Sequence, residues 1–298
     1  MTQPVTIIEV GTRDGLQSEA SFVPTEEKVK FINLLSQSGL KHIEVTSFVS
    51  AKAIPQLADN TLVFNAIDKP KGIDFSALVP NELGLQQAIT AGLKHIAIFT
   101  AASESFNQRN INCSIAESIE RITPVIAQAR ASHLQIRAYI SCVLGCPYEG
   151  NITPQQVLKV TQQLLALGVD EISFGDTIGV GTPKQTQALI SALDTIMPKN
   201  MIAMHFHNTY GQALANIYAS LNADIYRFDS ATAGLGGCPY AQGATGNIAT
   251  EDVLYLMHGL GLSTGVDIYK IVKAGEMMCK ILNRKNQSNV ARALLAEN

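Results

Sequence analysis

Short runs of β-branched and aromatic residues recur along the chain, separated by longer stretches in which apolar residues stand three or four positions apart. The first pattern predicts buried strands, and the second predicts amphipathic helices. Thr25 is suited to cap one such helix, because apolar residues follow at positions 29, 32 and 35. We predict strands over residues 5–10, 42–46, 73–79, 92–99, 135–140, 171–176, 202–205 and 225–228.

One type of junction between helix and strand is repeated. Segment 38–45 (SGLKHIEV) is similar to segment 91–98 (AGLKHIAI), and segment 167–174 (LGVDEISF) repeats the shape more loosely. In each, a helix ends at a glycine and an apolar strand begins almost at once, which is typical of a parallel sheet. Eight strands with helices between them predict an α/β protein with a closed (β/α)8 barrel, the TIM barrel.

The alternative fold is an open, doubly wound sheet. We favour the barrel because polar residues follow many different strands and do not gather at one switch point. The region between Phe48 and Ile73 is irregular, so the helix expected there has no clear bounds. From Thr264 onward the pattern is helical. We expect a single catalytic domain over residues 1–298, in which residues 264–298 form a C-terminal helical extension.

Composition excludes several classes of function. The chain has 298 residues, 46% of them hydrophobic, so it can bury a large core. Its formal net charge of -3 gives no electrostatic reason to expect nucleic acid or an anionic membrane as a partner. No apolar run is long enough to cross a bilayer. The N-terminal residues resemble neither a secretory signal nor a transit peptide, and the five cysteines are scattered, which predicts reduced thiols in the cytoplasm.

Polar and ionisable side chains follow the predicted strands, in contrast to the apolar strands themselves. All strands of a barrel end at the same face, so we expect these side chains to gather around one site. They are Arg13 and Asp14 after the first strand, Glu44, Thr46 and Ser47 at the second, Arg137, Tyr139, Ser141 and Cys142 at the fifth, Asp176 and Thr177 at the sixth, His205, His207 and Asn208 at the seventh, and Asp229, Cys238 and Asn247 after the eighth.

His205 and His207 form an H-x-H pair at a strand end. Residues two apart in an extended chain point to the same face, so both imidazoles can reach one ion. Closure of the barrel brings the first, seventh and eighth strands together, so Asp14 and Asn247 can complete the ligand set. These ligands suit Mg²⁺, Mn²⁺ or Zn²⁺, and a site rich in oxygen favours Mg²⁺ or Mn²⁺. The alternative is two histidines in a polar loop that binds no metal.

A glycine-rich loop surrounds Cys238 in the segment 227–252. Its glycines allow the backbone to approach a ligand closely and to move, and the single thiol suggests chemistry. The alternative is a tight turn in which Cys238 is an incidental small residue.

Four segments together resemble one family: 13–17 (RDGLQ), 175–183 (GDTIGVGTP), 205–211 (HFHNTYG) and 234–240 (GLGGCPY). Segments 141–147 and 105–110 agree with them. On these motifs the chain resembles 3-hydroxy-3-methylglutaryl-CoA lyases over nearly its whole length. The RDG and H-x-H motifs are shared with a wider group of metal-dependent aldolases and Claisen condensing enzymes, whereas the glycine-rich loop with RDGLQ is more specific to the lyases.

The resemblance implies a retro-Claisen cleavage of (S)-3-hydroxy-3-methylglutaryl-CoA to acetyl-CoA and acetoacetate, as in leucine degradation, with a divalent Mg²⁺ or Mn²⁺ cofactor and an acyl-CoA substrate. It also implies a homodimer. The implied metal ligands are Asp14, His205, His207 and Asn247. The implied catalytic residues are Arg13, Asp14, Cys238, His205, Glu44 and Asp176. Substrate-binding roles are implied for Arg13, Tyr139, Asn107 and Glu251.

Two kinds of alternative function stay open. One is a sister enzyme with the same metal site, either an aldolase or condensing enzyme, or a lyase for a longer branched 3-hydroxyglutaryl-CoA. The other is a barrel that binds acyl-CoA or metal without turnover. The base that removes the substrate proton is Asp14 or His205, and Arg13 is the expected stabiliser of an enolate oxygen. Asn208 stands where many members of the family have Asp, which affects the surroundings of the metal more than its ligands.

Overall fold

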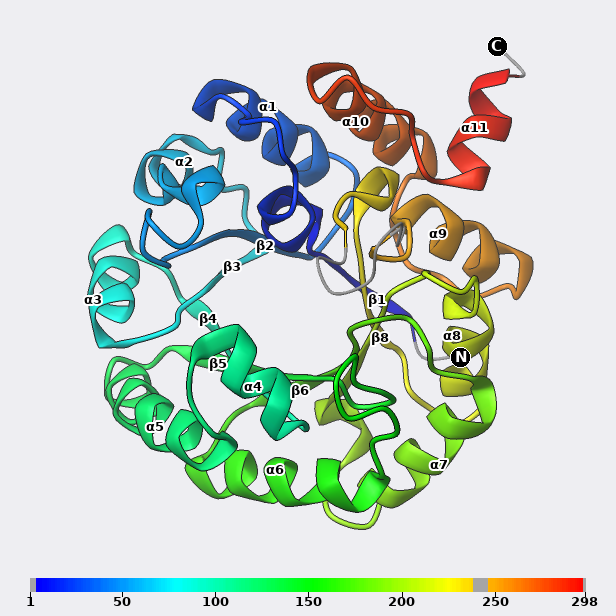
Figure 1. Cartoon of the computed structure of the whole chain (residues 1–298). Helices are drawn as coiled ribbons and strands as arrows, with labels where there is room; N and C mark the ends of the chain where they lie inside the picture. Colours follow the sequence, from blue (N-terminus) through cyan, green and yellow to red (C-terminus); the bar gives the residue numbers. More distant parts are fainter. Residues whose placement is uncertain (1–3, 238–245, 297–298) are drawn as a thin grey trace.

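Eight parallel strands pair in sequence order and close into a barrel in the computed structural model, which describes residues 4–237 and 246–296 (Figure 1). The prediction of a closed (β/α)8 barrel is therefore confirmed. Pairing of the first and last strands, from Thr6 with Arg227 to Glu9 with Ser230, closes the ring. The strands are β1 (Thr6–Glu9), β2 (His42–Ser47), β3 (Asp74–Leu78), β4 (His95–Ala101), β5 (Gln135–Ser141), β6 (Glu171–Asp176), β7 (Ile202–Phe206) and β8 (Arg227–Ser230).

Helices surround the barrel and cover the outer face of the strands (Figure 1). They are α1 (Thr25–Ser36), α2 (Asn60–Ala66), α3 (Glu82–Ala91), α4 (Glu104–Ile111), α5 (Ile115–Ala131), α6 (Pro154–Leu167), α7 (Pro183–Leu193), α8 (Ala213–Leu221), α9 (Thr250–Gly259), α10 (Ile268–Ile281) and α11 (Asn289–Ala296). The described residues also contain four single helical turns, η1 (Gly11–Gly15), η2 (Pro55–Leu57), η3 (Lys199–Met201) and η4 (Thr232–Gly234).

Helix α6 shows how the sequence sets the bounds of these elements. Thr153 and Gln156 form a capping box at its start, where each side chain accepts the other residue's backbone N–H. Its end is Gly168, which has a left-handed φ of 83° that glycine adopts without steric penalty. Between these ends, Val157 and Leu164 are fully buried against the core, so one face of the helix is apolar and covers the barrel.

Some bounds differ from those predicted. The predicted end of a helix at Gly92 is confirmed, because Gly92 follows α3 in the left-handed conformation, but β4 begins only at His95, three residues into the apolar run 92–99. The irregular region 48–73 contains the 3₁₀ turn η2 and the short helix α2. Strand β8 lies two residues further along the chain than predicted, so it includes Asp229.

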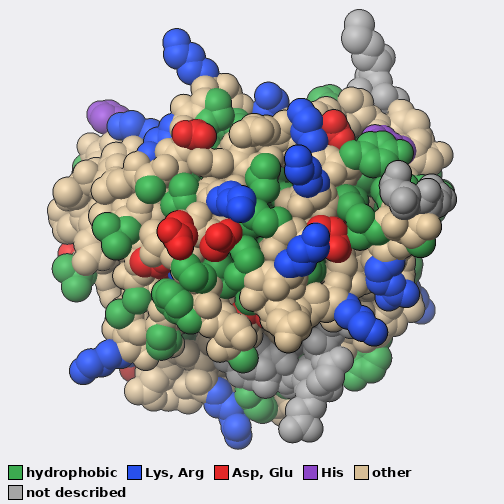
Figure 2. Space-filling model, turned by 90° about the horizontal axis from the view of Figure 1, so that it is seen from above, with side chains coloured by type: hydrophobic (Ala, Val, Ile, Leu, Met, Phe, Trp, Pro, Cys, Tyr) green, Lys and Arg blue, Asp and Glu red, His purple; other side chains and the backbone are tan. Residues whose placement is uncertain are grey.

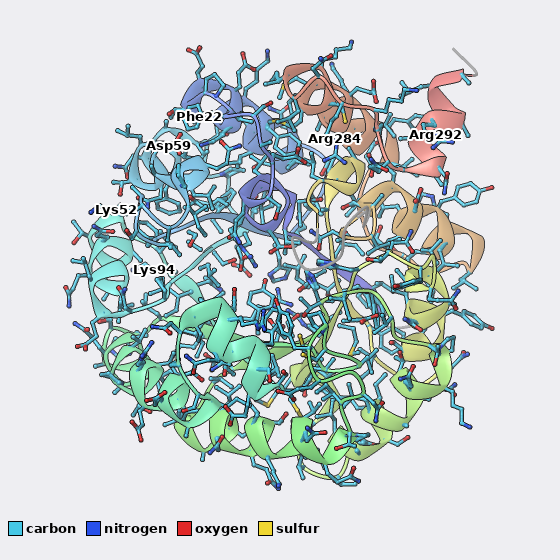
Figure 3. All side chains as sticks on the ribbon, viewed as in Figure 1. Phe22, Lys52, Asp59, Lys94, Arg284 and Arg292 are labelled. Atoms are coloured by element: carbon cyan, nitrogen blue, oxygen red, sulfur yellow. The ribbon has the colours of Figure 1, made fainter. Side chains whose placement is uncertain are left out.

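The predicted C-terminal extension is helical, as α10 and α11 show. Arg284, labelled in Figure 3, follows α10 and pairs with Glu19 in the segment after β1. Its Nη2 also donates to the carbonyl of Gly234, at 3.4 Å. Helix α11 is connected to α9, since the Asp252 carboxylate accepts the Ser288 hydroxyl at 2.6 Å. The extension therefore braces the turn that follows β8.

On the face shown in Figure 2, Lys and Arg side chains are dispersed among acidic and apolar ones. Within residues 4–237 and 246–296, no helix is long and apolar enough to cross a membrane.

Candidate active site and metal centre

The turn η1 carries Arg13 and Asp14 into the carboxyl end of the barrel. It is a single π-helical turn, in which the Gly15 N–H donates to the Val10 carbonyl at 3.1 Å. Such wide turns are frequent at functional sites. Gly15 is required here because a Cβ at this position would lie 2.8 Å from Leu235 Cβ. The turn after β1 and the turn after β8 are therefore in direct contact.

Arg13 is 6% exposed and lies between two carboxylates. Its Nη1 donates to Asp14 Oδ1 at 2.6 Å, and its Nε donates to Glu44 Oε1. Burial opposes a charge on the guanidinium, but Glu44 and Asp14 outweigh it and raise the pKa of Arg13 well above its usual range. Burial likewise opposes ionisation of Asp14, and Arg13 with the nearby histidines lowers the pKa of that carboxyl well below its usual range. Both groups are charged at every physiological pH.

Asp14, His205 and His207 bring one ligand atom each to within 4.8 Å of one another, which is the spacing of a metal site. Burial, and then the neighbouring His205, lower the pKa of His207 to about 4, so its imidazole is neutral and has a lone pair to offer. Its buried Nδ1 has no hydrogen-bond partner among the described residues. The donor set therefore fits a divalent cation.

Asn247 lies beside this cluster. Its Nδ2 donates to Asp14 Oδ2 at 2.9 Å and to the Leu235 carbonyl at 3.2 Å. With the amide nitrogen held in this way, the amide oxygen is the atom available to a cation. An isolated bridge pairs Asn247 with His207, so the four sequence-predicted ligands lie together at the end of strands β1, β7 and β8.

A chain of buried polar contacts leads from Arg13 around the inside of the barrel. Glu44 is fully buried, and its Oε2 accepts the Tyr139 hydroxyl at 3.0 Å. The guanidinium of Arg137 lies over the Tyr139 ring, 4.9 Å from its centroid. Arg137 Nη2 then donates to Asp229 Oδ1 at 2.6 Å. These contacts hold the side chains from Arg13 to Asp229 in one arrangement.

Asp229 completes this chain at His205. Its Oδ2 lies 3.2 Å from His205 Nδ1 and accepts the Ser173 hydroxyl at 2.8 Å. Burial opposes ionisation of Asp229, but Arg137 and His205 outweigh it and lower its pKa to about 2. Asp229 is thus a buried carboxylate with donors on both oxygens.

Asp176 ends β6 and holds the loop that follows. Its Oδ1 accepts the Val180 N–H at 3.2 Å, and its Oδ2 accepts the Gly181 N–H at 2.9 Å. Burial raises the pKa of Asp176 to about 6, although the backbone N–H groups act in the opposite direction. The observed contacts make it an anchor for residues 177–181, next to the strand that carries His205.

A pocket of about 450 Å³ opens over the cluster, and this volume is within the range of sites for small ligands. Arg13, Asp14, Tyr139, His205 and His207 form its polar side. Most of the apolar lining comes from the segment after β2, from β3 and β4 with the residues that follow β3, and from α4: Val49, Ala53, Ile54, Leu78, Pro80, Phe99, Phe106 and Ile111.

Ser141 and Thr177 also line the pocket, whereas Asn107 and Glu251, for which a substrate-binding role was predicted, do not. Asn107 is 1% exposed in α4, and its Nδ2 donates to the Ser114 carbonyl at 2.9 Å. Glu251 is fully buried at the start of α9 and accepts the N–H of Ala233. These contacts give each of them a structural partner in place of a direct contact with the pocket. Cys238 lies outside the described residues.

Sequence reasoning included Arg137 and Asp229 among the polar groups at strand ends, but assigned them no role. The sequence does contain a sign of their importance, because an arginine and an aspartate within otherwise apolar strands need polar partners when they are buried. Their partners come from strands far apart in the sequence, which a single sequence does not reveal.

The barrel, the buried arginine and the cluster of acid and imidazole groups define an enzyme class whose catalytic end can bind a divalent cation. A family model described as HMGL-like matches residues 4–278, so the chain belongs to the HMGL-like family. The chain is 52% identical to a 3-hydroxy-3-isohexenylglutaryl-CoA/hydroxy-methylglutaryl-CoA lyase of Pseudomonas aeruginosa, over 100% of this chain and 99% of the relative.

Two solved structures are similar throughout. A crystal structure of hydroxymethylglutaryl-CoA lyase from Pseudomonas aeruginosa has a TM-score of 0.98 at 51% identity, covering 100% of this chain and 99% of the other. An HMG-CoA lyase in complex with coenzyme A and 3-methylmalate, from Acinetobacter baumannii, has a TM-score of 0.94 at 35% identity, covering 98% of this chain and 97% of the other.

Proposed function

We propose that this chain is a metal-dependent carbon–carbon lyase that cleaves 3-hydroxy-3-methylglutaryl-CoA to acetyl-CoA and acetoacetate. The observation that carries the proposal is the position of Arg13 beside Asp14, in the same pocket as His205 and His207. Membership of the HMGL-like family supports it, as do the lyases to which the chain is similar.

The reaction needs a base, a cation for the enolate and a proton donor. The C3 hydroxyl loses its proton, the C2–C3 bond breaks to leave the C3 ketone of acetoacetate, and the electron pair passes to C2 and the thioester oxygen as an enolate. Protonation of C2 then gives acetyl-CoA. Mg²⁺ or Mn²⁺ held by Asp14, His205, His207 and Asn247 would supply positive charge that makes the substrate hydroxyl more acidic.

Arg13 is placed to stabilise the enolate oxygen. Its Nε and Nη1 are occupied by Glu44 and Asp14, and its Nη2 makes no hydrogen bond with the described residues while the side chain lines the pocket. The two carboxylates therefore fix the plane of the guanidinium and leave donors for the substrate. The base is Asp14 or His205, and Cys238 is the proposed proton donor.

Incubation with 3-hydroxy-3-methylglutaryl-CoA and Mg²⁺, with both products quantified, tests the proposal directly. Equal amounts of acetyl-CoA and acetoacetate are expected, and the Arg13→Gln variant is the control for a contaminating lyase. Binding of the acyl-CoA without release of either product would instead support a barrel that binds without turnover.

The apolar wall of the pocket favours a second candidate, a lyase for substrates with a longer branched group at C3. Its eight apolar side chains exceed what a single methyl group needs, and the Pseudomonas aeruginosa relative is named for both substrates. A comparison of kcat/KM for 3-hydroxy-3-methylglutaryl-CoA and 3-hydroxy-3-isohexenylglutaryl-CoA decides between them. A ratio above 10 for either substrate would identify the preferred one.

A further inference from the structure

The two histidines of the metal cluster differ in what holds them. His205 Nδ1 lies 3.2 Å from Asp229 Oδ2, whereas the buried His207 Nδ1 has no hydrogen-bond partner among the described residues. His205 and Asp229 are direct partners in the register of β7 with β8, so their side chains share the inner face of the barrel. The part of the chain that the structure describes thus provides an orienting group for the His205 imidazole and none for that of His207.

Asp229 itself is held so that it can only accept hydrogen bonds from His205. Arg137 Nη2 donates to its Oδ1 at 2.6 Å, and Ser173 Oγ donates to its Oδ2 at 2.8 Å. The Asp229 side chain is fully buried, and both of its oxygens already accept from a donor, so its contact with His205 is one in which the carboxylate accepts. The nitrogen that faces it must therefore carry the proton.

We propose that Asp229 is a positioning residue that fixes His205 as the Nδ1–H tautomer, so that the lone pair on Nε2 faces Asp14 and His207. Because Nδ1 is occupied by Asp229, Nε2 is the nitrogen left for the proposed metal site. An imidazole bound in this way has no lone pair left for a proton, so of the two candidates for the base this proposal favours Asp14. Carboxylates of this kind commonly orient histidine ligands of metals. The inference rests on the proposed metal site, but the tautomer is a property of the protein without metal.

Arg137 gives the proposal a specific consequence for the Asp229→Asn variant. An arginine only donates hydrogen bonds, so the amide oxygen of Asn at position 229 would face Arg137. The amide NH₂ would then face His205 and donate to Nδ1. That contact selects the opposite tautomer, with the proton on Nε2, where no lone pair remains for a metal.

The first measurement uses the wild-type enzyme without metal. Two-dimensional ¹⁵N–¹H NMR of protein labelled at histidine distinguishes the tautomers by the nitrogen shifts, and His205→Gln identifies the His205 signals. The Nδ1–H tautomer is expected for His205. A proton on Nε2 in the wild type would overturn the proposal, and this result does not depend on any enzymatic activity.

The second measurement compares variants by the same NMR experiment and by calorimetric titration of Mn²⁺. Asp229→Asn is expected to switch the tautomer and to weaken Mn²⁺ binding roughly 10- to 100-fold. Ser173→Ala is the matched control, because it removes the other donor to Asp229 Oδ2 and leaves the contact with His205. An unchanged tautomer and Mn²⁺ affinity in Asp229→Asn would contradict the proposal.

A double variant tests the role of Arg137. In Arg137→Met/Asp229→Asn both partners are neutral, so neither is left as an unpaired buried charge. Glu171, which also pairs with Arg137, keeps its ion pair with Arg227. The amide is then released to turn its oxygen toward His205. Recovery of the Nδ1–H tautomer and of part of the Mn²⁺ affinity is expected. If the double variant behaves like Asp229→Asn alone, Arg137 does not orient this group. If the wild type shows no lyase activity but His205 has the Nδ1–H tautomer, the proposed function is wrong and the role of Asp229 stands.

Discussion

Both carboxylate oxygens of Glu251 accept the backbone N–H of Ala233, at 3.0 and 2.9 Å. Ala233 has a φ of 59°, in the left-handed region that a residue with a Cβ rarely adopts. Glu9 acts on the same turn, since its carboxylate accepts the N–H and hydroxyl of Thr232 at 2.9 and 2.7 Å. Two buried acids therefore hold the backbone from which the glycine-rich loop departs.

Glu251 makes stability depend on pH. Burial raises its pKa to about 8, although its hydrogen bond with the Ala233 N–H acts in the opposite direction. A carboxyl with a raised folded-state pKa contributes stability that is full below its unfolded value and is lost as the pH rises through about 8. We expect the wild type to lose a few kcal/mol between pH 5 and 8 relative to Glu251→Gln. Denaturant unfolding of both proteins across this pH range checks the prediction. A difference in free energy of unfolding between them that is constant with pH would contradict it.

Removal of the metal should abolish turnover. Treatment with EDTA is expected to inactivate the enzyme, and Mg²⁺ or Mn²⁺ should restore activity. His207→Ala should lower Mn²⁺ affinity by roughly 10-fold or more, because the neutral imidazole that supplies one ligand is lost. Full activity of a preparation shown to be free of metal would exclude a metal-dependent reaction.

Arg13 should affect the chemical step more than binding. Arg13→Gln is expected to lower kcat by about 10² to 10³, the scale of one lost oxyanion donor, with a smaller change in KM. Arg13→Lys should also be impaired, because an ammonium cannot bridge Glu44 and Asp14 as the planar guanidinium does. Steady-state kinetics separate the two parameters, and an effect confined to KM would remove the enolate role.

Cys238 should be the thiol that matters for catalysis. The other four cysteines, Cys113, Cys142, Cys146 and Cys279, are buried, so an alkylating reagent should reach them slowly. Alkylation should inactivate the wild type, and substrate should protect it. Cys238→Ser should lose most of its turnover, since a hydroxyl is a much weaker acid than a thiol. Mass spectrometry locates the modified residue, and near-normal turnover of Cys238→Ser would transfer the donor role to another group.

The barrel itself could be predicted because a few adjacent residues are enough to indicate each strand and each junction between helix and strand. Examples are the junctions at Gly39 and Gly92, where an apolar run follows a glycine. The four expected ligands follow from the same logic, since closure places the ends of β1, β7 and β8 together. The segment 48–73 could not be resolved from sequence because η2 and α2 are too short for a periodic pattern. The roles of Asp229 and Arg137 could not be predicted because they depend on which side chains meet across different strands. The pattern within one strand shows only which face of the sheet a side chain points to.

The pairing of β1 with β8 also determines when a site can exist at all. Asp14 follows the first strand and Asn247 follows the last, and their side chains meet at 2.9 Å only after the ring has closed. A chain in which the last strand has not yet formed lacks the contact between Asp14 and Asn247 at the proposed ion site. A cation that binds the four proposed ligands would therefore stabilise the closed ring, so metal content would report on completed assembly of this protein as well as on its catalytic competence.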